Sequence, residues 1–135
     1  MFSIEFPAEA VHVSTARIFS AAVARHFGAD PADIEDVKIA LTEACGSAIS
    51  HVKDGSPEPV RVAAVPERGM LTFEVNGHRR GELMPPASSN ADLNTEQHKI
   101  ALSAELIGAL FPDAEFFDRP EGTFFRLSVP AGGAG

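Results

Sequence analysis

The sequence predicts an α/β two-layer sandwich, in which three helices pack on one face of a mostly antiparallel mixed sheet. Two observations support this prediction. Residues 2–6 and 71–75 alternate apolar and polar residues as half-buried strands do, and three longer segments repeat apolar residues at helical spacing. The elements follow the order β-α-α-β-β-loop-α-β-β along 135 residues, a length that suits one domain. Periodicity alone identifies an α+β domain, and three helices packed against a mostly antiparallel sheet make the two layers.

One strand and two helices are predicted in the N-terminal part of the chain. Residues 2–6 alternate apolar and polar side chains and are predicted as a strand. Residues 11–27 carry apolar side chains at helical spacing and are predicted as the first helix. The second helix should run from Pro31 to about residue 52, because Asp30 suits the N-cap and proline suits the first helical position.

The rest of the chain is predicted to hold four strands and the third helix. The strands cover residues 60–64, 71–75, 114–118 and 123–129, and the helix covers residues 96–111. Residues 76–94 show no periodicity and are rich in Gly, Pro and Ser, as functional or disordered loops are. We therefore expect a single domain over residues 1–130 and a flexible tail over residues 131–135.

Composition and charge narrow the class of protein. With 44% hydrophobic and 22% charged residues, the chain has an ordinary globular composition. A net charge of -8 argues against a nucleic-acid-binding surface. No apolar run is long enough for a signal peptide or a membrane span. Cys45 is the only cysteine, which excludes an internal disulfide and a cysteine-based metal cluster. We expect a cytoplasmic protein.

The second helix carries a polar face made of short side chains. Glu43, Ser47, Ser50 and His51 gather on one arc, apart from the apolar arc of the same helix. A solvent-exposed helix more often carries Lys, Arg and Glu, so this face is expected to line a pocket below the loop at residues 76–94. The alternative is a solvated face that happens to lack long side chains.

The same segment resembles a known motif. It reads Glu43-Ala44-Cys45-Gly46-Ser47-Ala48-Ile49-Ser50-His51. This is similar to the box E-A-x-x-N-A-I-x-H of the anti-sigma-factor serine/threonine protein kinases, a branch of the GHKL (histidine-kinase-like) ATPase superfamily with the Bergerat fold. The resemblance covers nearly the whole chain and implies ATP and Mg²⁺ as cofactors and Glu43 as general base. Ser47 replaces the asparagine that holds magnesium in the family, and His51 is either part of the nucleotide site or a helix-terminal histidine favoured by the helix dipole.

A second nucleotide-binding box departs from the family. The pattern V-x-D-x-G-x-G, whose aspartate accepts the adenine amino group, corresponds to Val75-Asn76-Gly77-His78-Arg79-Arg80-Gly81. The aspartate position is therefore Gly77, or Asn76 if the register shifts by one residue. Of the expected glycines, only Gly81 remains. A glycine at the aspartate position removes the hydrogen-bond acceptor that selects adenine.

The box that binds the phosphates is the third departure. In the family, a G-x-G-L/M sequence presents backbone amides at a helix N-terminus, and the matching residues here are 96–102. In this stretch Lys99 offers a phosphate only a loose positive charge. Gly122-Thr123 does match the family's turn before its last strand. Three altered boxes together indicate that ATP and Mg²⁺ bind weakly or not at all.

The resemblance also implies a partner-binding surface. Ala16-Arg17 matches an Ala-Arg pair through which family members contact the sigma factor or its antagonist, although Arg17 also suits a solvated helix. We therefore expect a bacterial transcription regulator, able to form a homodimer, that binds a sigma factor, a STAS-type anti-anti-sigma protein or both. The alternatives are an active ATP- and Mg-dependent serine protein kinase that phosphorylates the STAS partner, and a small-ligand sensor.

Overall fold

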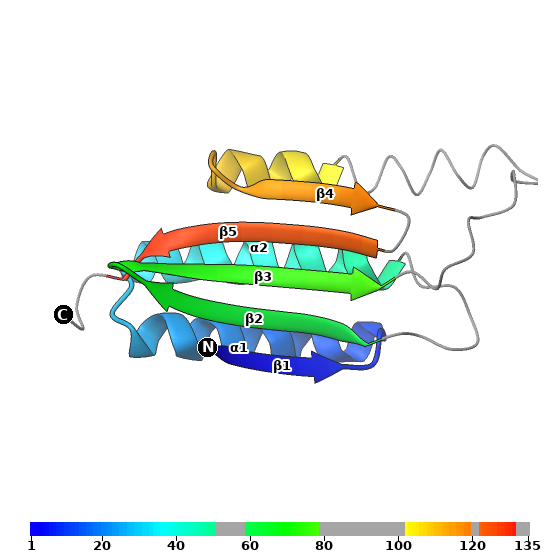
Figure 1. Cartoon of the computed structure of the whole chain (residues 1–135), viewed down its shortest axis with the longest axis horizontal. Helices are drawn as coiled ribbons and strands as arrows, with labels where there is room; N and C mark the ends of the chain where they lie inside the picture. Colours follow the sequence, from blue (N-terminus) through cyan, green and yellow to red (C-terminus); the bar gives the residue numbers. More distant parts are fainter. Residues whose placement is uncertain (51–58, 79–101, 120–121, 132–135) are drawn as a thin grey trace, which may run out of the picture.

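One five-stranded sheet organises the protein. The computed structural model describes residues 1–50, 59–78, 102–119 and 122–131. The strands are β1 (Phe2–Phe6), β2 (Val60–Glu67), β3 (Met70–His78), β4 (Glu115–Arg119) and β5 (Gly122–Pro130). They lie in the order β1-β2-β3-β5-β4, and each neighbouring pair is antiparallel (Figure 1).

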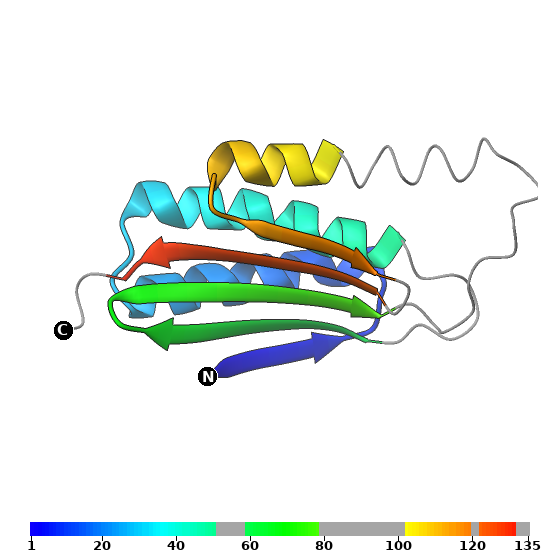
Figure 2. The ribbon, with the colours of Figure 1, turned by 45° about the horizontal axis from the view of Figure 1, so that its top comes forward.

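Helices cover one face of this sheet, and no helix or strand of the described ranges covers the other, the open face (Figure 2). They are α1 (Val13–His26), which follows a 3-10 turn at Ala10–His12, α2 (Pro31–Ser50), and a helix over residues 102–110. In Figure 1, α1 lies behind β1 and β2, α2 behind β3 and β5, and the third helix beside β4. The predicted two-layer sandwich with three helices on a mostly antiparallel sheet is confirmed. No helix in the described ranges is long and apolar enough to cross a membrane.

The structure corrects the predicted end of the third strand. Periodicity placed the start of a loop at Asn76, but β3 continues to His78. The extension has a partner, because Asn76 pairs with Phe124 and Gly77 pairs with Thr123 on β5. Backbone pairing therefore holds these residues in a strand although asparagine and glycine have low strand propensity. Of the predicted loop, residues 79–94 lie outside the described part of the chain, as do residues 96–101 of the predicted third helix and residues 132–135 of the tail.

A two-residue turn joins β2 to β3. Arg68 and Gly69 both have positive φ, 50° and 77°. Two successive positive φ values are characteristic of a type I′ turn, whose twist matches that of the strands it connects. The carbonyl of Gly69 also accepts a hydrogen bond of 2.8 Å from the Ala131 amide, which ties the end of β5 to this turn.

The apolar arc of α2 forms the centre of the core. Val37, Leu41, Ala44 and Ala48 are all buried and face the sheet, as the helical spacing predicts. The alanines in the second half of the helix are small, so the backbone of α2 can approach β3 closely there. Cys45 is buried as well, and this burial raises the pKa of its thiol to about 12. The thiol therefore stays protonated at neutral pH and serves as a small apolar core residue.

Candidate functional site

The second half of α2 contributes Glu43 to a polar contact between two helices. The hydroxyl of Ser103, on the helix over residues 102–110, donates a hydrogen bond of 3.2 Å to Glu43 Oε2. Glu43 is half-buried and Ser103 is buried. The carboxylate therefore points toward the third helix rather than into bulk solvent.

Ser47 lies one helical turn beyond Glu43 on the same side of α2. Its side chain is only 6% exposed. Residues four apart on a helix share a face, so the polar arc predicted for the second helix does turn inward at these two positions. The pocket predicted between this face and the loop at residues 76–94 is not tested, because most of that loop lies outside the described residues.

Gly77 is in close contact with the same stretch of α2. A Cβ atom added at Gly77 would lie 2.5 Å from Ala48 Cβ and 3.0 Å from the Ala48 Cα. It would also lie 3.1 Å from the hydroxyl oxygen of Thr123. Real Cβ atoms essentially never come within 2.5 Å of another side-chain carbon, so α2 can rest on β3 here only because residue 77 is glycine. The methyl group of Ala48 fills the space that a larger side chain at residue 77 would need.

Asn76 faces the opposite side of the sheet. Val75 and Gly77 are buried beneath the helices, and side chains alternate between the two faces along a strand. The side chain of Asn76 therefore points to the open face, away from Glu43 and Ser47. A register shift by one residue does not bring this amide to the polar face of α2.

Thr123 pairs with Gly77 across β3 and β5 and points to the helix-covered face. Its side chain is 2% exposed, and its hydroxyl has no hydrogen-bond partner among the described residues. A buried hydroxyl without a partner is destabilising. The structure thus brings Thr123 together with Gly77 and Ala48, close to where the sequence predicted a nucleotide site.

The other predicted site residues are separate from this cluster or cannot be placed. Arg17 is exposed on α1, a different helix from the one that carries Glu43. His51, Gly81 and Lys99 lie outside the described residues. In the described ranges, no group of three or more His, Cys, Asp or Glu side chains could hold a metal ion.

Sequence reasoning missed Ser103. The signal was present, because Ser103 occupies the apolar stripe of its helix, at helical spacing from Ile107 and Leu110. A serine within an apolar stripe needs a polar partner, and here that partner is Glu43.

Comparison with known proteins places these observations in a family. The model of the histidine kinase-like ATPase domain matches residues 6–128, which is nearly the whole chain. A comparison with curated proteins finds no match.

Proposed function

Because the chain belongs to the histidine kinase-like ATPase domain family, we propose that it is an anti-sigma-factor-like regulator. In this proposal it acts by binding a sigma factor, a STAS-type anti-anti-sigma protein or both, and its ATP binding is impaired. The family as a whole binds ATP and Mg²⁺ and includes the anti-sigma factor kinases. The proposal therefore assigns the function to protein contacts rather than to phosphoryl transfer.

The close packing at Gly77 is the observation that carries this proposal. The family pattern has an aspartate at this position, which accepts the adenine amino group. Here a side chain at residue 77 would collide with Ala48, since even a Cβ atom would lie 2.5 Å from the Ala48 methyl group. The described residues do not fit adenine in the family manner, because the acceptor is missing and α2 fills its place. A charged hydrogen bond of this kind contributes about 1.5–3 kcal/mol.

Ser47 supports the same conclusion for the metal ion. Mg²⁺ prefers several oxygen ligands at near-ideal octahedral positions. A serine hydroxyl sits on a shorter side chain than the amide oxygen of asparagine, and Ser47 is buried on α2. In this proposal the shorter side chain makes Ser47 a poorer magnesium ligand than asparagine.

The outer surface of α1 supports binding to a protein partner. Arg17 is exposed, and the side chains of Val11 and Ile18, just before and within α1, are 71% and 66% exposed. Ala16, next to Arg17, is fully buried, so the helix turns its arginine outward by ordinary amphipathic packing. An arginine with apolar neighbours is a common anchor at protein interfaces.

One observation favours the kinase alternative. Glu43, which matches the family's general base, is retained and is held in place by the Ser103 hydroxyl. A carboxylate acts as base toward a serine hydroxyl only beside a bound and polarised γ-phosphate. The two functions therefore differ in one measurable property, the affinity for magnesium-ATP.

Isothermal titration calorimetry with magnesium-ATP tests the proposal. The chain has no Trp and no Tyr, so intrinsic fluorescence offers no convenient signal. We expect a Kd above about 0.1 mM, which corresponds to a binding free energy weaker than about 5.5 kcal/mol. A low-micromolar Kd, together with transfer of the γ-phosphate to a STAS partner, would establish the kinase instead. The Glu43→Ala variant is the control, because it removes the base and should abolish any true transfer.

A further inference from the structure

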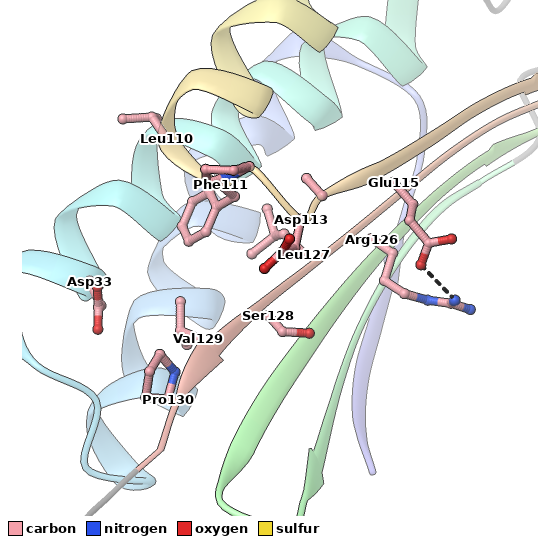
Figure 3. Close-up of a pocket in the computed structure, with 12 residues that line it drawn as sticks. Asp33, Leu110, Phe111, Asp113, Glu115, Arg126, Leu127, Ser128, Val129 and Pro130 are labelled. Atoms are coloured by element: carbon pink, nitrogen blue, oxygen red, sulfur yellow. Dashed lines mark hydrogen bonds and ion pairs between the residues drawn. The ribbon is translucent and has the colours of Figure 1, made fainter.

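A pocket lies at the opposite end of α2 from Glu43 and Ser47. It has a volume of about 180 Å³ and is bordered by Asp33 in the first turn of α2, by residues 110–115, and by residues 126–130 of β5. Figure 3 shows Asp33 at one end of this pocket and the ion-paired Glu115 and Arg126 at the other. Ligand pockets for small molecules usually measure about 300–1,000 Å³, so this pocket suits a single long side chain.

The base of the pocket is apolar. Phe111, Leu127 and Val129 border it and are each at least nine-tenths buried, while Leu110 covers one side. The alkyl part of a long side chain would remove these apolar atoms from water, a gain of about 25 cal/mol per Å². The pocket therefore favours a side chain with a long hydrocarbon stem.

Carboxylates surround this apolar base. Asp33 and Asp113 border the pocket, and neither makes a hydrogen bond or ion pair within the part of the chain that the structure describes. Arg126 also borders it, but its guanidinium lies 3.2 Å from both Glu74 and Glu115, which together offset its charge. The pocket therefore presents an unbalanced negative charge, which is complementary to the cation of a lysine or arginine.

No strand of the described ranges pairs with the edge of β5 beside this pocket. β4 pairs with β5 only as far as Arg126, opposite Glu115. The Ala131 amide donates a hydrogen bond to Gly69, on the β3 side of β5. Backbone groups alternate between the two sides of a strand, so the N–H and C=O groups of Val129 and Leu127 also point toward β3. The N–H and C=O of Ser128 point to the other side, beyond the first residue of β4. Ser128 thus offers an N–H and a C=O to an incoming extended chain. Pro130, the next residue that faces this side, has no N–H and limits the free edge.

The apolar base, the carboxylates and the unpaired strand edge are three features that suit one ligand. From them we propose that an extended segment of a partner protein binds beside residues 127–130, where it adds to the edge of β5 next to the pocket. One lysine or arginine of that segment enters the pocket, with its stem on Phe111 and Val129 and its cation between Asp33 and Asp113. Edge addition supplies backbone hydrogen bonds, and the pocket selects the side chain. The site lies at the far end of α2 from Gly77, so the proposal stands whether or not the protein binds ATP.

Titration of the ¹⁵N-labelled full chain with a blocked pentapeptide, acetyl-Ser-Thr-Lys-Thr-Ser-amide, tests the proposal by NMR. We expect saturable shifts of the amides of Leu127, Ser128 and Val129, and at least ten-fold weaker binding of matched peptides with glutamate or norleucine in place of lysine. Equal binding of the norleucine peptide, no saturable shift, or shifts confined to the free edge of β1 would overturn it. So would the same shifts on raising the protein concentration alone, because the occupant would then be a second copy of the chain.

Two sets of variants separate the pocket from the strand edge. Asp33→Asn and Asp113→Asn should each weaken the lysine peptide at least five-fold, whereas Glu105→Gln, an exposed acid on the third helix outside the pocket, should change binding less than two-fold. Ser128→Pro removes the free N–H and should abolish binding, whereas Ser128→Ala keeps it and should retain binding. If Ser128→Pro does not fold, the peptide affinities of Asp33→Asn and Asp113→Asn still test the proposal. Unchanged binding by both asparagine variants would overturn the proposal.

Discussion

The two ends of α2 meet the sheet in opposite ways. At its C-terminal end, Ala48 lies so close to Gly77 that a single added carbon would collide. At its N-terminal end, Asp33 borders a pocket of about 180 Å³ beside the open edge of β5. The C-terminal end of α2 at Ala48, the filled end, carries the residues that match a nucleotide-binding motif. The N-terminal end at Asp33, the open end, carries no recognisable motif.

The difference between the two ends shows that a sequence motif and a pocket large enough for a ligand are separate properties of a fold. Glu43 matches its place in the family's box, whereas α2 packs on β3 so closely that residue 77 has no room for a side chain. The pocket end of α2 is open because the strands differ in length. β4 begins at Glu115, opposite Arg126, whereas β5 continues past this point to Pro130. In the two proposals above, one close approach removes a nucleotide site and one short strand exposes a peptide site.

The largest expected effect comes from breaking the packing at the filled end. Gly77→Asp should lower the free energy of unfolding by about 3–5 kcal/mol, because the side chain overpacks against Ala48 and a carboxylate is buried. Urea denaturation followed by circular dichroism measures this change. The matched control is Asn76→Asp, whose side chain faces the open side of the sheet and should change stability by less than about 1 kcal/mol.

A stable Gly77→Asp variant would contradict this account of the filled end. If that variant also bound magnesium-ATP more tightly than the parent, α2 would have to move away from β3 to admit the nucleotide. The closeness of Ala48 would then describe only one of two states, and the kinase alternative would gain support.

The sequence predicted the elements well where the pattern is local. Alternation in residues 2–6 and helical spacing in residues 31–50 depend on neighbours in the chain, and both elements form as expected. The last residues of β3 were missed because Asn76 and Gly77 are poor strand formers that are held by pairing with Phe124 and Thr123 on β5. Pairing between segments almost 50 residues apart leaves no local signal.

The same reasoning explains what was missed in the candidate sites. Glu43 and Ser47 belong to a continuous motif, so their shared face could be predicted from spacing alone. The Ser103 contact joins residues 60 positions apart, and the pocket at Asp33 joins the start of a helix to the end of a distant strand. The spacing of Ser103 in its helix indicates that it needs a polar partner, but no contiguous pattern identifies Glu43 as that partner or brings the two sides of the pocket together.

Arg17→Ala tests whether partner binding resides on α1 rather than at either end of α2. We expect binding to a sigma factor or STAS partner to weaken by about 1–3 kcal/mol, because the side chain is exposed beside apolar neighbours. Alanine is a good helix former, so the fold should be intact. Calorimetry at fixed salt against the same partner makes the measurement, and Glu43→Ala should barely change that affinity. If Arg17→Ala bound the partner as tightly as the parent and Glu43→Ala lost phosphate transfer, the kinase would be favoured over the binding regulator.

Stability at alkaline pH tests the burial of Cys45, which lies on α2 between its two ends. Burial raises the pKa of Cys45 from 9.0 to about 12, so the thiol stays protonated in the folded state while the unfolded state ionises first. Its contribution to stability is therefore complete below pH 9 and is lost as the pH rises from 9 toward 12. By pH 10 the loss is about 1.4 kcal/mol. Urea denaturation at pH 8 and pH 10 measures it, and Cys45→Ala should lack this part of the pH dependence. An equal loss in both proteins would show that Cys45 is not the cause.

The smallest expected effect concerns the buried hydroxyl at the filled end. Thr123→Val keeps the shape of the side chain and removes a hydroxyl that has no hydrogen-bond partner among the described residues. Stability should therefore stay the same or rise by up to about 1 kcal/mol. The control is Thr72→Val on the open face, where the lost hydroxyl lies 2.7 Å from that of Ser128 and the expected change is a loss of about 0.5–1 kcal/mol. Thermal and urea unfolding of both variants give the two signs. Destabilisation of Thr123→Val by more than about 1 kcal/mol would mean that the Thr123 hydroxyl is satisfied in solution, and that the end of α2 described here as filled still has room for a polar partner.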